Sequence, residues 1–502
     1  MIKSQKYLIF FAVILNCLIT SLSLLHHQPI NVDGIIYLKA AQAYLDQGFH
    51  VAVANYPWPF YSIFIALTSQ LTHLSLLHAG FVLNTVLTSI LVVTFVLLIK
   101  ELGGTLFEQY LGLFTIICYP FLNHDLYNIL RDFGYYAFFL VAFLFFIYYL
   151  RHFKWRDAFI VTLSLLIALL FRIESILILL LAPLIVLFKK EMHLSQKIYA
   201  TIKLYIPGIL LGSLGLATVF IKYHTMNIDF KNINIFFNVL ISGPSYIVSN
   251  LSAKEILIQH DILNIYGQDS ANIFLFGGMI AIFIDSFFTT MSGFYTVIVC
   301  YALLTKKIIL ESNARLALYG FILLYSLILF GFILTELFLP GRYIVPICLL
   351  LMLLIPFALT RLAQFYLQHN NKYWLPILFI IGLLYSVINA FGHFGTSKTY
   401  IMTAGNWIKN NTTPASQLYS NDPTLAFYSE RQGTLYQGIQ NDNDWLITLK
   451  NTSLNNYDYL ALVIHNDEIA KEKQVILWLH KKPIKQWQNN FGDSAILFDL
   501  RH

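Results

Sequence analysis

Long apolar runs separated by short polar segments dominate the chain up to about residue 395. A helix that crosses a membrane needs about 20 mainly apolar residues. Eleven runs approach or exceed the required length and predict membrane spans at residues 7–25, 79–99, 106–122, 133–150, 157–171, 175–188, 202–221, 289–305, 315–336, 343–361 and 373–392. A further segment, 271–288, is apolar enough to be re-entrant or interfacial.

The runs 157–171 and 175–188 are each short for a bilayer whose apolar core is about 30 Å thick. One helix over both would place Arg172 and Glu174 near the middle of the membrane, where charges are costly. We therefore expect a hairpin with these two residues at its outer turn. Two positions apart on a helix, their side chains would point in different directions, so we do not expect them to pair with each other.

The pattern changes after residue 395. Strand-like runs occur at 459–464 and 495–498, and helical runs occur at 400–409 and 467–480. This mixture predicts a small α/β domain over residues 396–502. The expected fold class is therefore a polytopic α-helical membrane protein of about eleven spans, residues 1–395, followed by a C-terminal α/β domain.

Composition and charge agree with this division. Of the 502 residues, 58% are hydrophobic and 12% are charged, whereas soluble domains carry about 25% charged residues. Lipid must therefore solvate most of the surface, which excludes a cytosolic enzyme, a disordered chain and a nucleic-acid binder. Lysine and arginine collect on one side of the predicted spans, so the positive-inside rule places the N-terminus in the cytoplasm and the C-terminal domain outside. We expect a multi-pass protein of a bacterial inner membrane.

The first outer loop, residues 26–78, contains the first candidate functional residues. It predicts a helix over residues 35–47 that ends at Gly48, a usual C-cap residue. Asp33 and Tyr37 lie four residues apart and so share one helical face. Asp33 is either the N-cap of this helix, since Asp is favoured there, or a carboxylate that acts on a substrate at the membrane surface.

Charged and aromatic residues recur at the outer ends of three other predicted spans. As structural groups they would be a helix cap, a hydrated turn and an aromatic belt with a snorkelling arginine. Charges at a membrane boundary are costly unless they are paired or functional. Carboxylates and arginines at one depth suit a site that handles a lipid-borne anion and a neutral polar group. These residues are Arg131, Asp132, Arg172, Glu174, Arg342 and Tyr343.

Several other chemistries have no support in the sequence. There is no P-loop motif, no H-E-x-x-H, no G-x-S-x-G and no C-x-x-C. The 15 histidines are scattered, and neither His26-His27 nor His124-Asp125 belongs to a ligand set. We therefore expect no cofactor; a divalent metal stays open, but no set of ligands in the sequence supports one.

With these residues the chain resembles the GT-C superfamily of membrane glycosyltransferases, which includes the protein O-mannosyltransferases and the aminoarabinose transferases of lipid A. Many relatives have a second acidic residue after the first-loop Asp, where this chain has Gly34. This departure argues against a metal site of the kind seen in oligosaccharide transferases. The resemblance covers most of the chain and is carried by Asp33-Gly34-(x2)-Tyr37-(x2)-Ala40, Tyr56-Pro57-Trp58-Pro59, Arg131-Asp132 and Arg342-Tyr343-(x2)-Pro346.

The resemblance implies transfer of a sugar from a polyprenyl-phosphate donor to a hydroxyl of a glycan, lipid or protein acceptor on the extracytoplasmic face. Asp33 would be the general base, with Asp132 as the next candidate. Arg342, and after it Arg131, would neutralise the donor phosphate. Attack opposite the leaving group would invert the anomeric carbon. The remaining residues expected to bind substrate are Tyr37, Arg172, Glu174 and Tyr343.

Two other functions remain open at this point. A transporter or flippase of lipid-linked sugars would line a path through the membrane with charges and would show internal repeats. The sequence shows neither, because its charges collect at one boundary. A glycan polymerase or ligase uses related transfer chemistry and is harder to separate from the proposed transferase.

Overall fold

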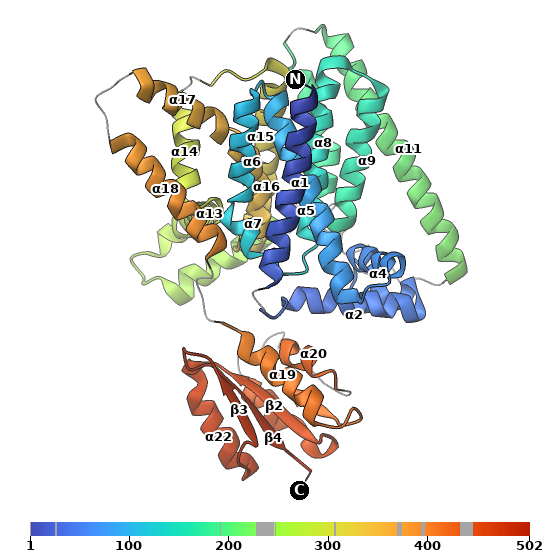
Figure 1. Ribbon diagram of the computed structural model, residues 1–502, viewed down its shortest axis with the longest axis vertical. Coiled ribbons are helices and arrows are strands. Elements are labelled where there is room, and N and C mark those ends of the chain that lie inside the picture. Colours follow the sequence, from blue (N-terminus) through green and yellow to red (C-terminus); the bar gives the residue numbers. More distant parts are fainter. Residues whose placement is uncertain are drawn as a thin grey trace.

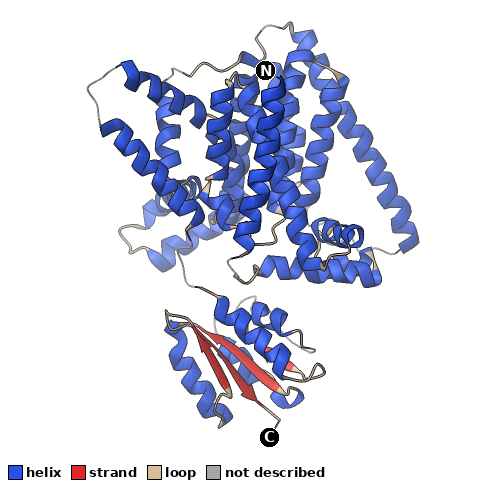
Figure 2. Ribbon diagram, viewed as in Figure 1, coloured by secondary structure: helices blue, strands red, loops and turns tan. Residues whose placement is uncertain are grey.

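The structure is a computed structural model that describes residues 2–25, 28–190, 192–226, 245, 247–305, 308–368, 374–392, 397–431 and 445–501. It consists of a bundle of helices and a smaller α/β domain (Figure 1), and the described strands all lie in that domain (Figure 2). The main helices of the bundle are α1 (Ile2–Leu24), α2 (Val32–Gln47), α3 (Phe49–Asn55), α4 (Phe60–Thr72), α5 (Leu76–Glu101), α6 (Leu106–Ile117), α7 (Pro120–His124), α8 (Asp132–His152), α9 (Trp155–Phe171), α10 (Ser175–Leu181), η1 (Ala182–Phe188), α11 (Leu194–Met226), α13 (Ala271–Met291), α14 (Gly293–Leu304), α15 (Ser312–Glu336), α16 (Gly341–Met352), α17 (Ile355–Gln368) and α18 (Trp374–Phe391).

Six described helices are long and apolar enough to cross a membrane: α1, α5, α8, α11, α13 and α15. The pair α16 and α17, bent by 43°, would be a seventh if it forms one span. Each predicted span overlaps a helix, so the prediction of a helical membrane protein is confirmed, but the count of about eleven is not. The segment 271–288, which the sequence left as re-entrant or interfacial, lies in α13 and is one of the six.

Helix α8 lies at the centre of the bundle and packs against α5 and α9. In the most apolar stretch of α8, 78% of the residues are buried, whereas in that of α1 only 22% are buried. Gly134 allows α9 to approach closely, because a Cβ at this position would lie 2.4 Å from the ring of Phe171. This packing holds the first residue of α8, Asp132, inside the protein at the outer end of the bundle.

The connection between α9 and α10 is a tight turn. Helix α9 ends at Phe171, Arg172 has an extended backbone, and α10 begins at Ser175. The Ser175 hydroxyl donates a hydrogen bond to the carbonyl of Leu165 (3.0 Å), so α10 packs back on α9. This geometry agrees with the expected hairpin and places Arg172 and Glu174 at its turn.

The C-terminal domain has a four-stranded sheet in the order β1-β2-β4-β3. Strands β1 and β2 are parallel and the other pairs are antiparallel, with Leu460 opposite Phe498. Strand β2 is buried along its whole length, because α19 and α20 cover one face of the sheet and α21 and α22 cover the other. The two predicted helices and two predicted strands are confirmed as α19 (Thr399–Asn411), α22 (Ile469–Leu479), β2 (Tyr459–Ile464) and β4 (Ser494–Asp499). The structure adds four elements that the sequence analysis did not predict: β1 (Leu418–Ser420), α20 (Pro423–Ser429), α21 (Trp445–Asn451) and β3 (Lys485–Gln488).

The two parts meet beside the start of α2. The Tyr428 hydroxyl of α20 accepts a hydrogen bond from the backbone N–H of Ile30 (3.2 Å), and α20 packs against α2. The predicted domain boundary at residue 395 lies outside the described residues.

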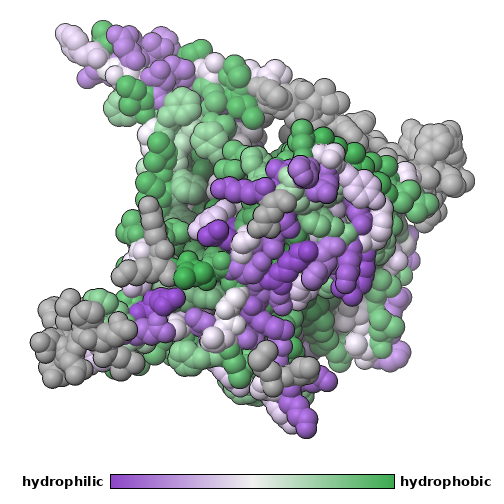
Figure 3. Space-filling model, turned by 90° about the horizontal axis from the view of Figure 1, so that it is seen from above, coloured by the Kyte–Doolittle hydropathy of each residue, from purple (hydrophilic) through white to green (hydrophobic). Residues whose placement is uncertain are grey.

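The N-terminus lies at the opposite end of the bundle from the C-terminal domain (Figure 1). Viewed from the N-terminal end, hydrophilic residues gather over the middle of the face, and the flanks are largely hydrophobic (Figure 3). We name this the N-terminal end, and we name the end with α2 and the C-terminal domain the outer end. A membrane across the bundle would therefore separate the two.

This arrangement predicts opposite accessibility for two introduced cysteines. A cysteine at Asn490, an exposed residue of the C-terminal domain, should react with a membrane-impermeant thiol reagent in intact cells, because positive-inside bias places this domain outside. A cysteine at Ser4 should react only after lysis. The wild-type chain, with its four native cysteines, gives the background. The reverse pattern of labelling would contradict the predicted topology.

Candidate functional site

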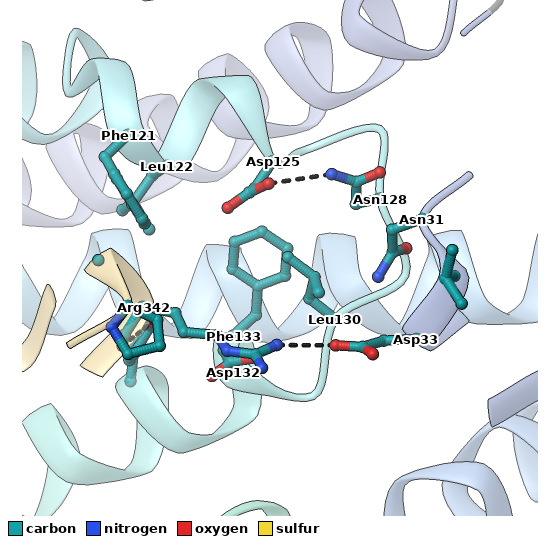
Figure 4. A pocket seen from close by; sticks show the side chains of 14 residues that line it. Asn31, Asp33, Phe121, Leu122, Asp125, Asn128, Leu130, Asp132, Phe133 and Arg342 are labelled. Carbon is teal, nitrogen blue, oxygen red and sulfur yellow. Dashed lines mark hydrogen bonds and ion pairs between the residues drawn. The ribbon is translucent and has the colours of Figure 1, made fainter. Parts of the chain in front are cut away.

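A cavity of about 440 Å³ lies at the outer end of the bundle, where the starts of α2, α8 and α16 meet α7. The lining of the cavity mixes polar and apolar residues. The polar residues that line it are Asn31, Asp33, Asp125, Asn128, Asp132, Tyr136 and Arg342, and the apolar ones include Phe121, Leu122, Leu130 and Phe133 (Figure 4).

Asp33 and Arg342 form an ion pair at this cavity although they are 309 positions apart in the chain. Asp33 Oδ2 lies 2.7 Å from Arg342 Nη1, and the side chains remain 39% and 42% exposed. The sequence placed both residues at one membrane boundary but did not predict that they would pair with each other. Because both side chains are open to solvent, a competing anion can reach this guanidinium.

The start of α2 is held in place by Asn31 and not by Asp33. Asn31 occupies the N-cap position, and its side-chain oxygen accepts a hydrogen bond from the backbone N–H of Ile129 (3.1 Å). Asp33 lies in the first turn without capping the helix, so the interpretation of Asp33 as an N-cap is wrong. Its carboxylate is therefore available to groups in the cavity.

Gly34 permits the close contact between α2 and the segment before α8. A Cβ at this position would lie 2.7 Å from Asn31 Oδ1 and 3.1 Å from Ile129 Cβ. A carboxylate side chain here, as in many relatives in the GT-C superfamily, would displace that segment. The packing thus explains why this chain does not have a second acidic residue beside Asp33.

Asp125 is a candidate that the sequence analysis missed. It was considered only as a metal ligand beside His124, but its carboxylate points into the cavity and accepts a hydrogen bond from the Asn128 amide (2.9 Å) (Figure 4). The neighbouring His124 is directed elsewhere and contacts the carbonyl of Asn389. The one signal in the sequence that could have identified Asp125 is the position of this residue between two predicted spans, at the outer boundary.

A chain of two hydrogen bonds, through Asn84 to Tyr61, fixes the position of Asn128. Its carbonyl accepts a hydrogen bond from the Asn84 amide of α5 (2.9 Å), and Asn84 in turn accepts one from the Tyr61 hydroxyl (2.6 Å).

Burial raises the pKa of Asp125 to about 6, although the hydrogen bond from Asn128 lowers it. Asp125 therefore changes its charge closer to neutral pH than an ordinary aspartate does.

Asp132, by contrast, belongs to a buried ionic cluster. Arg172 is 2% exposed and pairs with Asp132, which is also 2% exposed, and with Glu174 (2.8 Å). The guanidinium carbon of Arg172 lies 3.8 Å from the centre of the Tyr343 ring, a cation–π contact. The cluster thus joins α8, the α9–α10 turn and α16, and we call it the Arg172 cluster.

The expectation that Arg172 and Glu174 do not pair is wrong. It assumed a helical geometry, but the helix ends before Arg172, so both side chains can turn to the same side. The interpretation of Asp132 as a cap is also wrong, because its carboxylate pairs with Arg172. These charges thus satisfy one another inside the protein.

Arg131 and Tyr37 lie next to the cavity in a group of aromatic residues. The Arg131 guanidinium lies 5.7 Å from the Tyr56 ring centre, and Tyr37 makes edge contacts with Tyr56 and Tyr61 (5.2 Å each). Burial raises the pKa of Tyr37, so its phenol stays protonated. The predicted residues therefore form three groups, and Asp33 and Arg342 are the pair that is open to the cavity.

The described residues do not fit a metal site of the oligosaccharide-transferase kind. Among them, no three His, Cys, Asp or Glu side chains converge to hold an ion. Asp33 and Asp132 are each paired with an arginine. The absence of a cofactor stays a prediction.

No family model and no curated protein match this chain. Among solved structures it is similar to the archaeal oligosaccharyltransferase AglB from Archaeoglobus fulgidus, in complex with an inhibitory peptide and a dolichol-phosphate (TM-score 0.47, 13% identity, 94% of this chain and 71% of that chain). It is also similar to an Archaeoglobus fulgidus oligosaccharyltransferase tethered to an acceptor peptide (TM-score 0.44, 13% identity, 88% and 60%). These are enzymes of the superfamily that the motifs resemble.

The Arg172 cluster predicts a large stability difference between two ion pairs. Asp132→Asn should lower the free energy of unfolding by about 3 kcal/mol, because it leaves a buried guanidinium without one of its two counter-charges. Arg342→Ala, which breaks the exposed pair, should cost less than about 1 kcal/mol. Thermal unfolding of the protein in detergent measures both. Equal shifts for the two variants would contradict the structural role of the cluster.

Proposed function

We propose that the chain is a membrane glycosyltransferase. It moves a sugar from a polyprenyl-phosphate donor to an acceptor hydroxyl on the extracytoplasmic face, with inversion at the anomeric carbon. The observation that carries this proposal is the solvent-open Asp33–Arg342 pair at a cavity at the outer end of the bundle. It combines a carboxylate that can accept a proton with a guanidinium that can bind a phosphate.

Arg342 binds the donor phosphate in this mechanism. A guanidinium presents paired donors that match phosphate oxygens. Arg342 lines the cavity, and its backbone carbonyl accepts a hydrogen bond from the Tyr136 hydroxyl (2.7 Å). The apolar residues of the lining, which include Leu130 and Phe133, can contact the first isoprene units of the lipid. Arg131, the second choice from the sequence, is less suited because it lies over Tyr56 and does not line the cavity.

Donor binding would also release the base. In the ion pair, Arg342 occupies the Asp33 carboxylate, and the singly charged phosphodiester of the donor frees Asp33 to accept the acceptor's proton when it takes over Arg342. The acceptor oxygen then forms its bond to the anomeric carbon as the bond from that carbon to the phosphate oxygen breaks. The proton goes to Asp33 and the electron pair goes to the phosphate, whose charge Arg342 stabilises.

Asp125 supplies the second carboxylate of the site in place of Asp132. Both carboxylates line the cavity, but that of Asp132 is already paired with buried Arg172. Asp125 has only Asn128 as a hydrogen-bond donor to its carboxylate among the described residues. Ionised Asp125 would accept hydrogen bonds from sugar hydroxyls and orient them. The sugar and the acceptor follow from assays of membranes with a panel of polyprenyl-phosphate sugars and mass spectrometry of the products.

Replacement of Asp33 tests the assignment of the base. Asp33→Asn should lower turnover by roughly 10²–10⁴-fold, the usual contribution of a general base, while binding of the donor persists because Arg342 remains. Asp46→Asn, a change of the exposed carboxylate that accepts from Gln42 in the same helix, should have little effect. Near-normal transfer by Asp33→Asn would mean that Asp33 is not the base.

The pKa of Asp125 predicts a pH dependence. Because burial raises this pKa to about 6, the carboxylate is ionised above pH 6 and becomes protonated below it. Transfer should therefore fall about tenfold for each unit of pH below 6 in the wild type. Asp125→Asn should be slow at every pH and should lose this step. A step of the same size in Asp125→Asn would assign it to another group.

A further inference from the structure

A second cavity lies at the N-terminal end of the bundle, far from the site described above. It has a volume of about 740 Å³ and lies between η1 and the first half of α15. It is a groove with a polar mouth and apolar walls. Its mouth is formed by residues at the end of η1 and the start of α15, and its walls continue along both helices.

The apolar wall on α15 is a single stripe. Leu316, Gly320, Leu323 and Leu327 recur every three or four residues and so share one face of the helix. At 1.5 Å per residue this stripe is roughly 17 Å long, which is about the depth of one leaflet of a core roughly 30 Å thick. The leucines at 323 and 327 are 62% and 54% exposed. The groove thus has the length and the lining for one acyl chain.

The mouth of the groove contains two cations that no described acidic residue neutralises. The side chains of Lys190 and Arg315 are exposed, and neither forms an ion pair with another described residue. The nearest carboxylate in the chain to Arg315, Glu311, is already used by Arg151 and by the backbone N–H of Ala314. A pair of cations without an acidic partner among the described residues, above an apolar groove, favours a ligand with an anionic head and an apolar tail.

We propose that this groove binds one anionic phospholipid, with its phosphate at Lys190 and Arg315 and one acyl chain along α15. A second copy of the chain is a poorer occupant, because its N-terminal end is also rich in exposed lysines such as Lys3 and Lys6 and would repel this mouth. A zwitterionic phospholipid is poorer too, because its ammonium group cancels the phosphate charge. The proposal does not depend on the glycosyltransferase reaction.

Native mass spectrometry of the full chain in detergent tests this proposal with two probes, phosphatidylglycerol and phosphatidylcholine with identical acyl chains. One phosphatidylglycerol molecule should remain bound at concentrations at which phosphatidylcholine does not. The double variant Lys190→Gln/Arg315→Gln should weaken phosphatidylglycerol binding by roughly tenfold or more, since each basic residue near an anionic headgroup contributes about 1 kcal/mol. The charge-matched control Lys6→Gln/Lys100→Gln, two exposed residues outside the groove, should bind as the wild type does.

Leu323→Trp separates the groove from the charges. It keeps both cations but fills the apolar wall, so phosphatidylglycerol binding should weaken even though the mouth is unchanged. Equal retention of the two lipids, or equal losses in the test and control variants, would show non-specific lipid and overturn the proposal. Dimers that appear as phosphatidylglycerol is removed and vanish in Leu323→Trp would identify the groove as an interface between copies.

Discussion

The outer end of this bundle depends on the burial of one guanidinium. Arg172 enters the protein at a turn between two helices and is almost fully shielded from solvent. An unpaired charge there would be prohibitive, so Asp132 and Glu174 must both lie against it. Satisfying this one group fixes the α9–α10 turn against the first residue of the central helix α8.

The Arg172 cluster also orients the cavity beside it. The Tyr343 ring lies over Arg172, and the preceding residue, Arg342, forms the ion pair with Asp33 at the cavity. One arginine is therefore committed to structure and the next one along the outer boundary is available to a ligand. The difference is one of exposure, because a buried pair cannot exchange its partner for a substrate anion at low cost, whereas a solvent-open pair can.

The two ends of the bundle use charge in different ways. At the outer end, two of the three aspartates that line the cavity are paired with arginines, and the solvent-open pair suits binding and release of a charged substrate. At the N-terminal end, exposed cations are in excess, and two of them lie above an apolar groove. The first arrangement favours chemistry at a phosphate and the second favours a stable contact with anionic lipid.

Composition and hydrophobic pattern were sufficient to determine the class of protein. Apolar runs too long for a soluble core predicted the membrane helices, and alternation of apolar runs with turns predicted the α/β domain, because both depend on solvation that is local in sequence. The pattern also placed Asp33, Asp132, Arg172 and Arg342 at one boundary.

Only the tertiary structure decided which of these charges pair. Asp33 pairs with Arg342, which is 309 positions away in the chain. Arg172 pairs with Asp132, which belongs to a different helix. Arg172 can reach Glu174 because α9 ends at Phe171. The spacing of residues on a helix had predicted that these two side chains would not pair. Asp125 gained its place because the end of α7 lines the same cavity as the starts of α2, α8 and α16. Sequence periodicity reports which side of an element is apolar, but the partner of a charge depends on which elements pack together, and that is set by the whole fold.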